Sequence, residues 1–141
     1  MRAVGVVGLL SIIVAMATPA IAGEQPFTGS FRGTGRACSG SLNIRTKTIE
    51  WRSSFSVCKP TRHEILDKDL TPEHRRIAYR LTARSKACRY EVVEIQHVDG
   101  AGWNATGYQS LESFQNREAP AWKNSQLPER QVLSCPMIGP N

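Results

Sequence analysis

The chain has 141 residues, four cysteines and a formal net charge of +6, and 40% of its residues are hydrophobic. This length suits one domain large enough to bury a core. The composition excludes a coiled coil, a repeat array, a transmembrane bundle and a disordered tail.

The first 22 residues are typical of a secretory signal peptide. Arg2 supplies the positive charge, Val4 to Met16 is an uncharged apolar run, and Ala20-Ile21-Ala22 has the small-x-small pattern of a cleavage site. The apolar run is shorter than the ~20 residues that a membrane span needs. We therefore expect residues 23–141 to form a single secreted or periplasmic domain with no transmembrane span after cleavage.

The mature chain begins with alternating apolar and polar residues, which predicts β-strands. Glycines around Phe31 indicate a kinked first strand. A hairpin follows, and its two strands (41–45 and 48–57) pair in a register that keeps every apolar side chain on one face. The expected pairs are Ile44 with Ile49, Leu42 with Trp51, Asn43 with Glu50, and Ser41 with Arg52.

The segment from Lys59 to Arg75 is the only stretch that favours a helix. Thr71 is a suitable N-cap residue, Pro72 suits the first helical position, and Glu73 is an acid in the first turn. We expect one or two helical turns here and no more.

A second hairpin is expected from the alternating residues 77–83 and 88–92, with a turn near Ser85-Lys86. Its register pairs Leu81 with Tyr90 and Tyr79 with Val92 inside, and Arg80 with Glu91 outside. The apolar phase shifts by one residue at Val92-Val93. Either a β-bulge or a strand buried on both faces would explain that shift.

The remaining segments predict two more strands. Asp99 to Gly102 is a turn, residues 103–114 form a long strand bent at Gly107, residues 115–130 form a loop, and residues 132–135 form a short final strand. The fold class is therefore mainly β, with about seven antiparallel strands and one short helical turn. Such a sheet closes into a small barrel or packs as a sandwich.

The cysteines Cys38, Cys58, Cys88 and Cys135 all lie in the mature chain, where an even count predicts two disulfides. In a seven-strand meander, Cys38 and Cys58 fall at one end of the sheet and Cys88 at the other. This placement favours Cys38 with Cys58 and Cys88 with Cys135 among the three pairings. Their spacing fits neither a zinc site nor a C-x-x-C redox motif, so we expect no metal.

Positive charge gathers on the second hairpin, where residues 75–89 hold six Lys and Arg and no acid. The expected register directs Arg76, Arg80, Arg84 and Arg89 outward, and such a row can grip phosphates or carboxylates. The partner would be an anionic envelope component or an acidic protein surface, although a merely solvated face fits the same pattern. No nucleic-acid-binding signature occurs.

Evidence for catalysis is absent from the sequence, because no nucleophile-elbow, metalloprotease or phosphate-loop motif occurs. If the protein were a small hydrolase, the best candidates for its general acid and base would be His63, Glu64 and His74. Trp103 and Tyr108 are candidate aromatic contacts, since Trp103 follows a glycine turn and could be partly exposed. We expect no cofactor.

In architecture, the expected domain resembles the small disulfide-bonded β-proteins that bacteria export, some of which inhibit lysozymes or bind envelope components. The resemblance carries no residue-level motif. The leading hypothesis is a non-enzymatic binding protein. The alternatives are an inhibitor or immunity protein against a secreted hydrolase, for which a rigid scaffold is well suited, and a small hydrolase.

Overall fold

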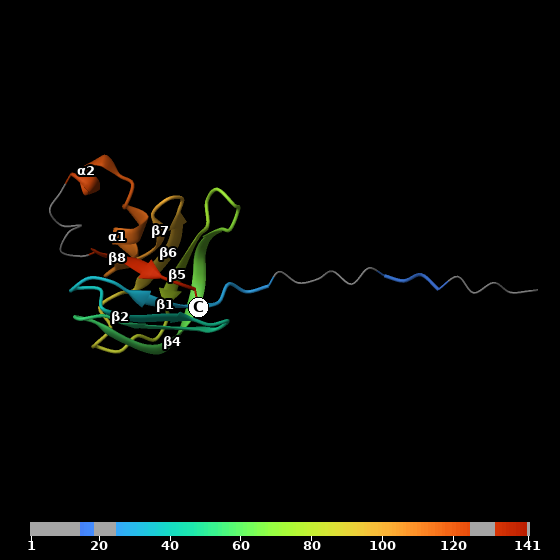
Figure 1. The fold of residues 1–141 in the computed structure, drawn as a ribbon, viewed down its shortest axis with the longest axis horizontal. Helices are drawn as coiled ribbons and strands as arrows, with labels where there is room; N and C mark the ends of the chain where they lie inside the picture. Colours follow the sequence, from blue (N-terminus) through green and yellow to red (C-terminus); the bar gives the residue numbers. More distant parts are fainter. Residues whose placement is uncertain (1–14, 19–24, 125–131, 141) are drawn as a thin grey trace, which may run out of the picture.

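A computed structural model describes residues 15–18, 25–124 and 132–140. Most of the expected signal peptide lies outside these residues. The described chain forms a closed antiparallel barrel in which eight strands follow one another in sequence order (Figure 1). The elements are β1 (Gly29–Gly33), β2 (Gly40–Ile44), β3 (Thr48–Arg52), β4 (Val57–Asp69), β5 (Arg76–Leu81), β6 (Val92–Val98), β7 (Gly102–Tyr108), α1 (Leu111–Gln115), α2 (Pro120–Lys123) and β8 (Val132–Ile138).

The expected mainly β fold is confirmed, with a barrel rather than a sandwich and with eight strands rather than about seven. The first hairpin has the expected register at all four pairs, including Leu42 with Trp51 and Ile44 with Ile49. The alternation of apolar and polar residues was sufficient to predict this register, because a slip of one residue would expose all the apolar side chains.

The prediction of a helical turn between Lys59 and Arg75 is wrong for most of that segment. Residues 57–69 form the long strand β4, and only a tight turn remains, with the His74 amide donating to the Thr71 carbonyl at 3.1 Å. The strand expected over residues 48–57 is instead interrupted by a turn at 53–56. This polar segment forms a strand because β3 and β5 supply hydrogen-bond partners for its backbone.

The barrel interior is filled by side chains from every strand. Trp51, Tyr79 and Ile95 are each 1% exposed or less, and Gly107 lies against the rings of Trp51 and Tyr90. Gly107 therefore makes room for aromatic side chains and is not the site of a bend.

The second hairpin has a register one residue away from the expected one, with Tyr79 opposite Val93 and Arg80 opposite Val92. Strand β6 is buried on both faces, which was one of the two explanations for its shifted apolar phase. Val93 and Ile95 point into the barrel core, and Val92 packs outside it with Ala78, Tyr108 and Phe114.

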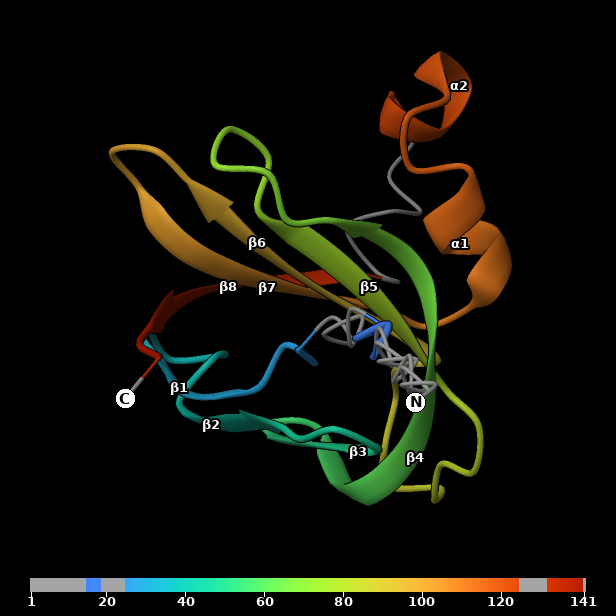
Figure 2. The same ribbon diagram turned by 90° about the vertical axis from the view of Figure 1, so that its right-hand side faces the viewer.

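The segment after β7 forms two short helices instead of a continued strand and a plain loop. Ser110 caps α1 by accepting a hydrogen bond from the Ser113 amide at 3.1 Å. Helix α1 lies against the outer wall of the barrel (Figure 2). Its Phe114 ring meets Tyr108 with ring centroids 5.3 Å apart.

The disulfides join Cys38 to Cys135 and Cys58 to Cys88, so the favoured pairing was wrong although the number of bridges was right. The cause is strand β4. One additional strand reverses the direction of every strand after it, and it brings the β5–β6 connection with Cys88 to the end that already holds Cys38 and Cys58. Two disulfides fit an oxidising compartment.

Candidate functional site

The end of the barrel that carries the disulfides is also rich in exposed cations. Three of the four connections at this end are residues 34–39, 53–56 and 82–91. Exposed cations lie on these connections and on the adjoining strand ends, and we call this set the cationic end: Arg32, Arg36, Arg52, Lys59, Arg84, Lys86 and Arg89.

Little acid offsets these cations. Residues 34–39, 53–59 and 82–90 contain no Asp or Glu. Within the described part of the chain, Arg52 alone of the set has a carboxylate within 4.0 Å, that of Glu50 at 2.9 Å. The fourth connection at this end holds α1 and α2, and there Glu118 pairs with Lys123 at 2.6 Å.

The connections of the cationic end hold one another in place. The Arg89 amide donates to the Ser56 hydroxyl at 3.0 Å, and the Val57 amide donates to the Ala87 carbonyl at 3.0 Å. The Cys58–Cys88 disulfide lies beside these bonds. The β3–β4 turn and the β5–β6 connection therefore form one cross-linked unit.

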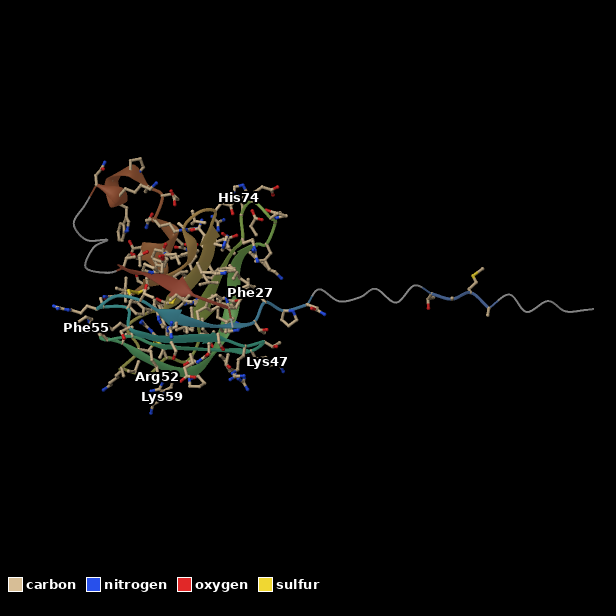
Figure 3. All side chains as sticks on the ribbon, in the orientation of Figure 1. Phe27, Lys47, Arg52, Phe55, Lys59 and His74 are labelled. Atoms are coloured by element: carbon tan, nitrogen blue, oxygen red, sulfur yellow. A yellow bond between two sulfur atoms is a disulfide. The ribbon has the colours of Figure 1, made fainter. Side chains whose placement is uncertain are left out.

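Phe55 stands at the tip of this unit with 62% of its surface exposed. Its turn is closed by the Ser53 amide, which donates to the Ser56 carbonyl at 2.9 Å, and by the Ser54 hydroxyl, which donates to the Arg36 carbonyl. Figure 3 shows Phe55 at the edge of the molecule, with Arg52 and Lys59 along the adjacent side.

The arginines expected on one face of the second hairpin divide into two groups. Arg84 and Arg89 belong to the cationic end, and the Arg84 guanidinium donates to the Arg89 carbonyl at 3.0 Å. Arg76 and Arg80 lie on the barrel wall, and each is bracketed by two carboxylates.

The acids that pair with Arg76 and Arg80 come from both neighbouring strands and from the β5–β6 connection. Arg80 lies 3.5 Å from Glu64 of β4 and 3.1 Å from Glu91, the partner expected from the sequence. Arg76 lies 2.8 Å from Asp67 of β4. Strand β4 thus neutralises the part of the basic hairpin that it pairs with.

The two candidate aromatic residues are buried, so the exposure expected for Trp103 was wrong. Trp103 is 8% exposed and packs against Phe27, Phe31 and His97, with Arg75 lying 5.3 Å from its ring centroid. Tyr108 is 7% exposed, and its hydroxyl donates to the Glu94 carboxylate at 3.5 Å.

The structure does not bring His63, Glu64 and His74 together. The His63 ring packs on Tyr79 at 4.5 Å, and its Nε2 lies 3.1 Å from the Arg45 carbonyl oxygen. His74 follows β4, whose end at Asp69 is about 20 Å along the strand from His63. Glu64 points to Arg80 instead.

A buried ionic cluster, which the sequence did not reveal, lies between the barrel wall and the segment just after α1. The Glu94 side chain is 8% exposed, and its Oε2 lies 3.7 Å from Arg117 Nε and 4.0 Å from Arg76 Nε. Arg117 in turn donates to the Phe114 carbonyl at 2.9 Å. Burial raises the pKa of the Glu94 carboxyl, and the two guanidinium groups counter that rise only in part.

This raised pKa predicts a specific pH dependence of stability for Glu94→Gln. A carboxyl whose pKa is higher in the folded state stabilises the fold fully below its unfolded pKa, and that stability is lost as the pH rises through the folded pKa. We therefore expect the melting temperature of Glu94→Gln, relative to that of the wild type, to increase between about pH 4 and pH 8. Thermal unfolding across this range measures the difference.

The matched control for that experiment is Glu112→Gln, a change at an exposed acid of α1. Because this acid is exposed, its substitution should change the melting temperature only slightly. A Glu94→Gln difference that falls as the pH rises would show that the arginines outweigh burial.

No three His, Cys, Asp or Glu side chains gather to hold a metal ion within residues 15–18, 25–124 and 132–140. In the same residues, no helix is long and apolar enough to cross a membrane. Comparisons with protein-family models, with curated proteins and with solved structures found no match for this chain.

Proposed function

We propose that this protein is an exported, non-enzymatic binding protein that recognises an anionic partner through the cationic end. The observation that carries the proposal is the excess of exposed cations in and beside residues 34–39, 53–59 and 82–90, which contain no acid. The filled barrel interior adds support, because it directs recognition to the outer surface.

The cross-linked connections suit a binding role in a second way. The Cys58–Cys88 disulfide and the bonds between residues 53–57 and 87–89 fix the positions of the cations before a partner arrives. A preorganised surface loses less conformational entropy on binding than a mobile one. Guanidinium groups also grip phosphate and carboxylate oxygens in pairs.

The experiment compares two triple variants with the same loss of charge. The test variant replaces Arg36, Lys86 and Arg89 with Ser, and it keeps Arg84 because that side chain supports its own loop. The control replaces Arg45, Lys47 and Arg62 with Ser as well. These three residues are exposed near the opposite end of the barrel.

We expect the test variant to elute from a heparin column at much lower salt than the wild type. The control should elute close to the wild type, because charges farther away than about 8 Å are screened at physiological ionic strength. Both variants should keep the wild-type melting temperature, since exposed substitutions change stability by about 0.5 kcal/mol or less. Equal elution of the two variants would contradict a role for the cationic end.

A further inference from the structure

Phe55 gives the cationic end a feature that charge alone does not explain. A single exposed hydrophobic side chain is ordinary on a protein surface. Phe55, however, is 62% exposed on a turn that is held by the Ser53–Ser56 hydrogen bond, by Ser54 and by the neighbouring Cys58–Cys88 disulfide. Its outward position is therefore built into the fold.

The surroundings of Phe55 differ from those of two exposed hydrophobic residues at the opposite end, Val98 and Leu70. Val98 is 42% exposed and precedes Asp99, and Leu70 is 36% exposed and follows Asp69. Phe55 has no acid within four residues on either side along the chain, and Arg52 and Lys59 flank its turn. The adjoining connections contribute Arg36, Lys86 and Arg89.

We propose that the cationic end docks on the surface of an anionic lipid bilayer, with Phe55 entering the interfacial layer between headgroups and acyl chains. This inference rests on the proposed function, whose anionic partner it identifies. Cations near an anionic leaflet are attracted to its headgroup phosphates, and an apolar side chain that enters the interface adds to the binding.

Two properties favour a bilayer over the other anionic partners. The cations come from three separate connections and adjoining strand ends, so a laterally extended anionic surface can meet many of them together without a matching pocket. An anionic polysaccharide would supply charges but no apolar layer for Phe55. A bilayer supplies both.

The test measures binding of residues 23–141, the expected mature chain, to sedimented vesicles. One set of vesicles contains phosphatidylglycerol and phosphatidylcholine, and the other contains phosphatidylcholine alone. We expect binding to the anionic vesicles only, and we expect this binding to weaken steeply with added salt.

Phe55→Ser separates insertion from simple charge attraction. It should weaken binding to the anionic vesicles about tenfold, because it removes most of the apolar surface that enters the interface. It should leave heparin elution unchanged. Val98→Ser is the matched control, and it should bind the vesicles as the wild type does.

A direct readout of insertion comes from Phe55→Trp. Both proteins carry Trp122→Phe, because Trp122 is partly exposed on α2. Brominated acyl chains should then quench Phe55→Trp more strongly than the parent, whose Trp51 and Trp103 are buried in the protein. Unchanged melting temperatures would show that both Phe55 variants are folded.

The outcomes distinguish the two proposals. Binding to heparin without binding to anionic vesicles would overturn the bilayer inference and leave the proposed function standing, with a polysaccharide or an acidic protein as the partner. Vesicle binding that Phe55→Ser does not weaken would overturn the insertion of Phe55. Binding to neither heparin nor vesicles would overturn both proposals.

Discussion

Replacing both Cys38 and Cys135 with Ala is expected to lower the free energy of unfolding by about 4.7 kcal/mol, the cost for a closed loop of about 100 residues. The bridge joins residues 97 positions apart. Its removal allows the unfolded chain many more conformations and leaves the folded contacts nearly unchanged. Chemical denaturation with urea, read out by circular dichroism, measures the loss.

The position of this bridge explains why its loss should be severe. Among the described residues, strands β1 and β8 close the barrel through two residue pairs, Arg32 with Ile138 and Gly33 with Met137. The hydrogen bond from the Thr34 amide to the Pro136 carbonyl, at 3.2 Å, extends that seam. The Cys38–Cys135 disulfide fastens the seam covalently.

The second bridge provides the comparison. Cys58 and Cys88 are 30 positions apart, so their double replacement with Ala should cost about 3.6 kcal/mol by the same chain-entropy relation. A larger loss for Cys58 and Cys88 than for Cys38 and Cys135 would show that loop entropy does not set the order.

Gly107→Val is expected to destabilise the protein by about 3 kcal/mol or more, at the upper end of the range for overpacked cores. A Cβ atom at this position would lie 2.6 Å from Tyr90 Cγ and 2.8 Å from Trp51 Cζ3. Both rings are buried, and Trp51 is 1% exposed, so neither can move without disturbing the core. Thermal unfolding should show a fall of about 10 °C or more.

A double-mutant cycle with Tyr90→Ala tests the cause of that loss. Removing the Tyr90 ring leaves space for the new side chain, so the two substitutions together should cost less than the sum of their separate effects. Strict additivity would mean that the contact with Tyr90 is not responsible, and that the contact with Trp51 or the Gly107 backbone accounts for the loss.

Local patterning was sufficient to predict the parts of the fold that depend on close neighbours in the chain. The hairpin of β2 and β3 followed from alternation alone, since its short turn and single apolar face permit one register. The predicted register of the second hairpin differs from the observed one by one residue. Its irregular ten-residue connection does not set the register, and β6 is apolar on both faces.

Strand β4 had the largest consequence of the features that local patterning missed. Its outer residues are polar and partly exposed, so its sequence lacks the apolar alternation of a strand. Strand β4 forms because its backbone hydrogen-bonds to β3 and β5. Its presence reverses the direction of every later strand relative to the seven-strand prediction. The pairing of the four cysteines depended on that reversal.

The candidate site shows the same division. The sequence by itself determined the mainly β fold, the two disulfides and the abundance of Arg and Lys, because composition and alternation are properties of the chain. Only the tertiary structure decided which cations remain available. Strand β4 places Glu64 and Asp67 against Arg80 and Arg76. The Cys58–Cys88 bridge lies next to the hydrogen bond that joins the Arg89 amide to Ser56, the residue after Phe55. Ion pairs and disulfides form between groups that are close in space, and the positions of these groups along the chain do not reveal which of them are close.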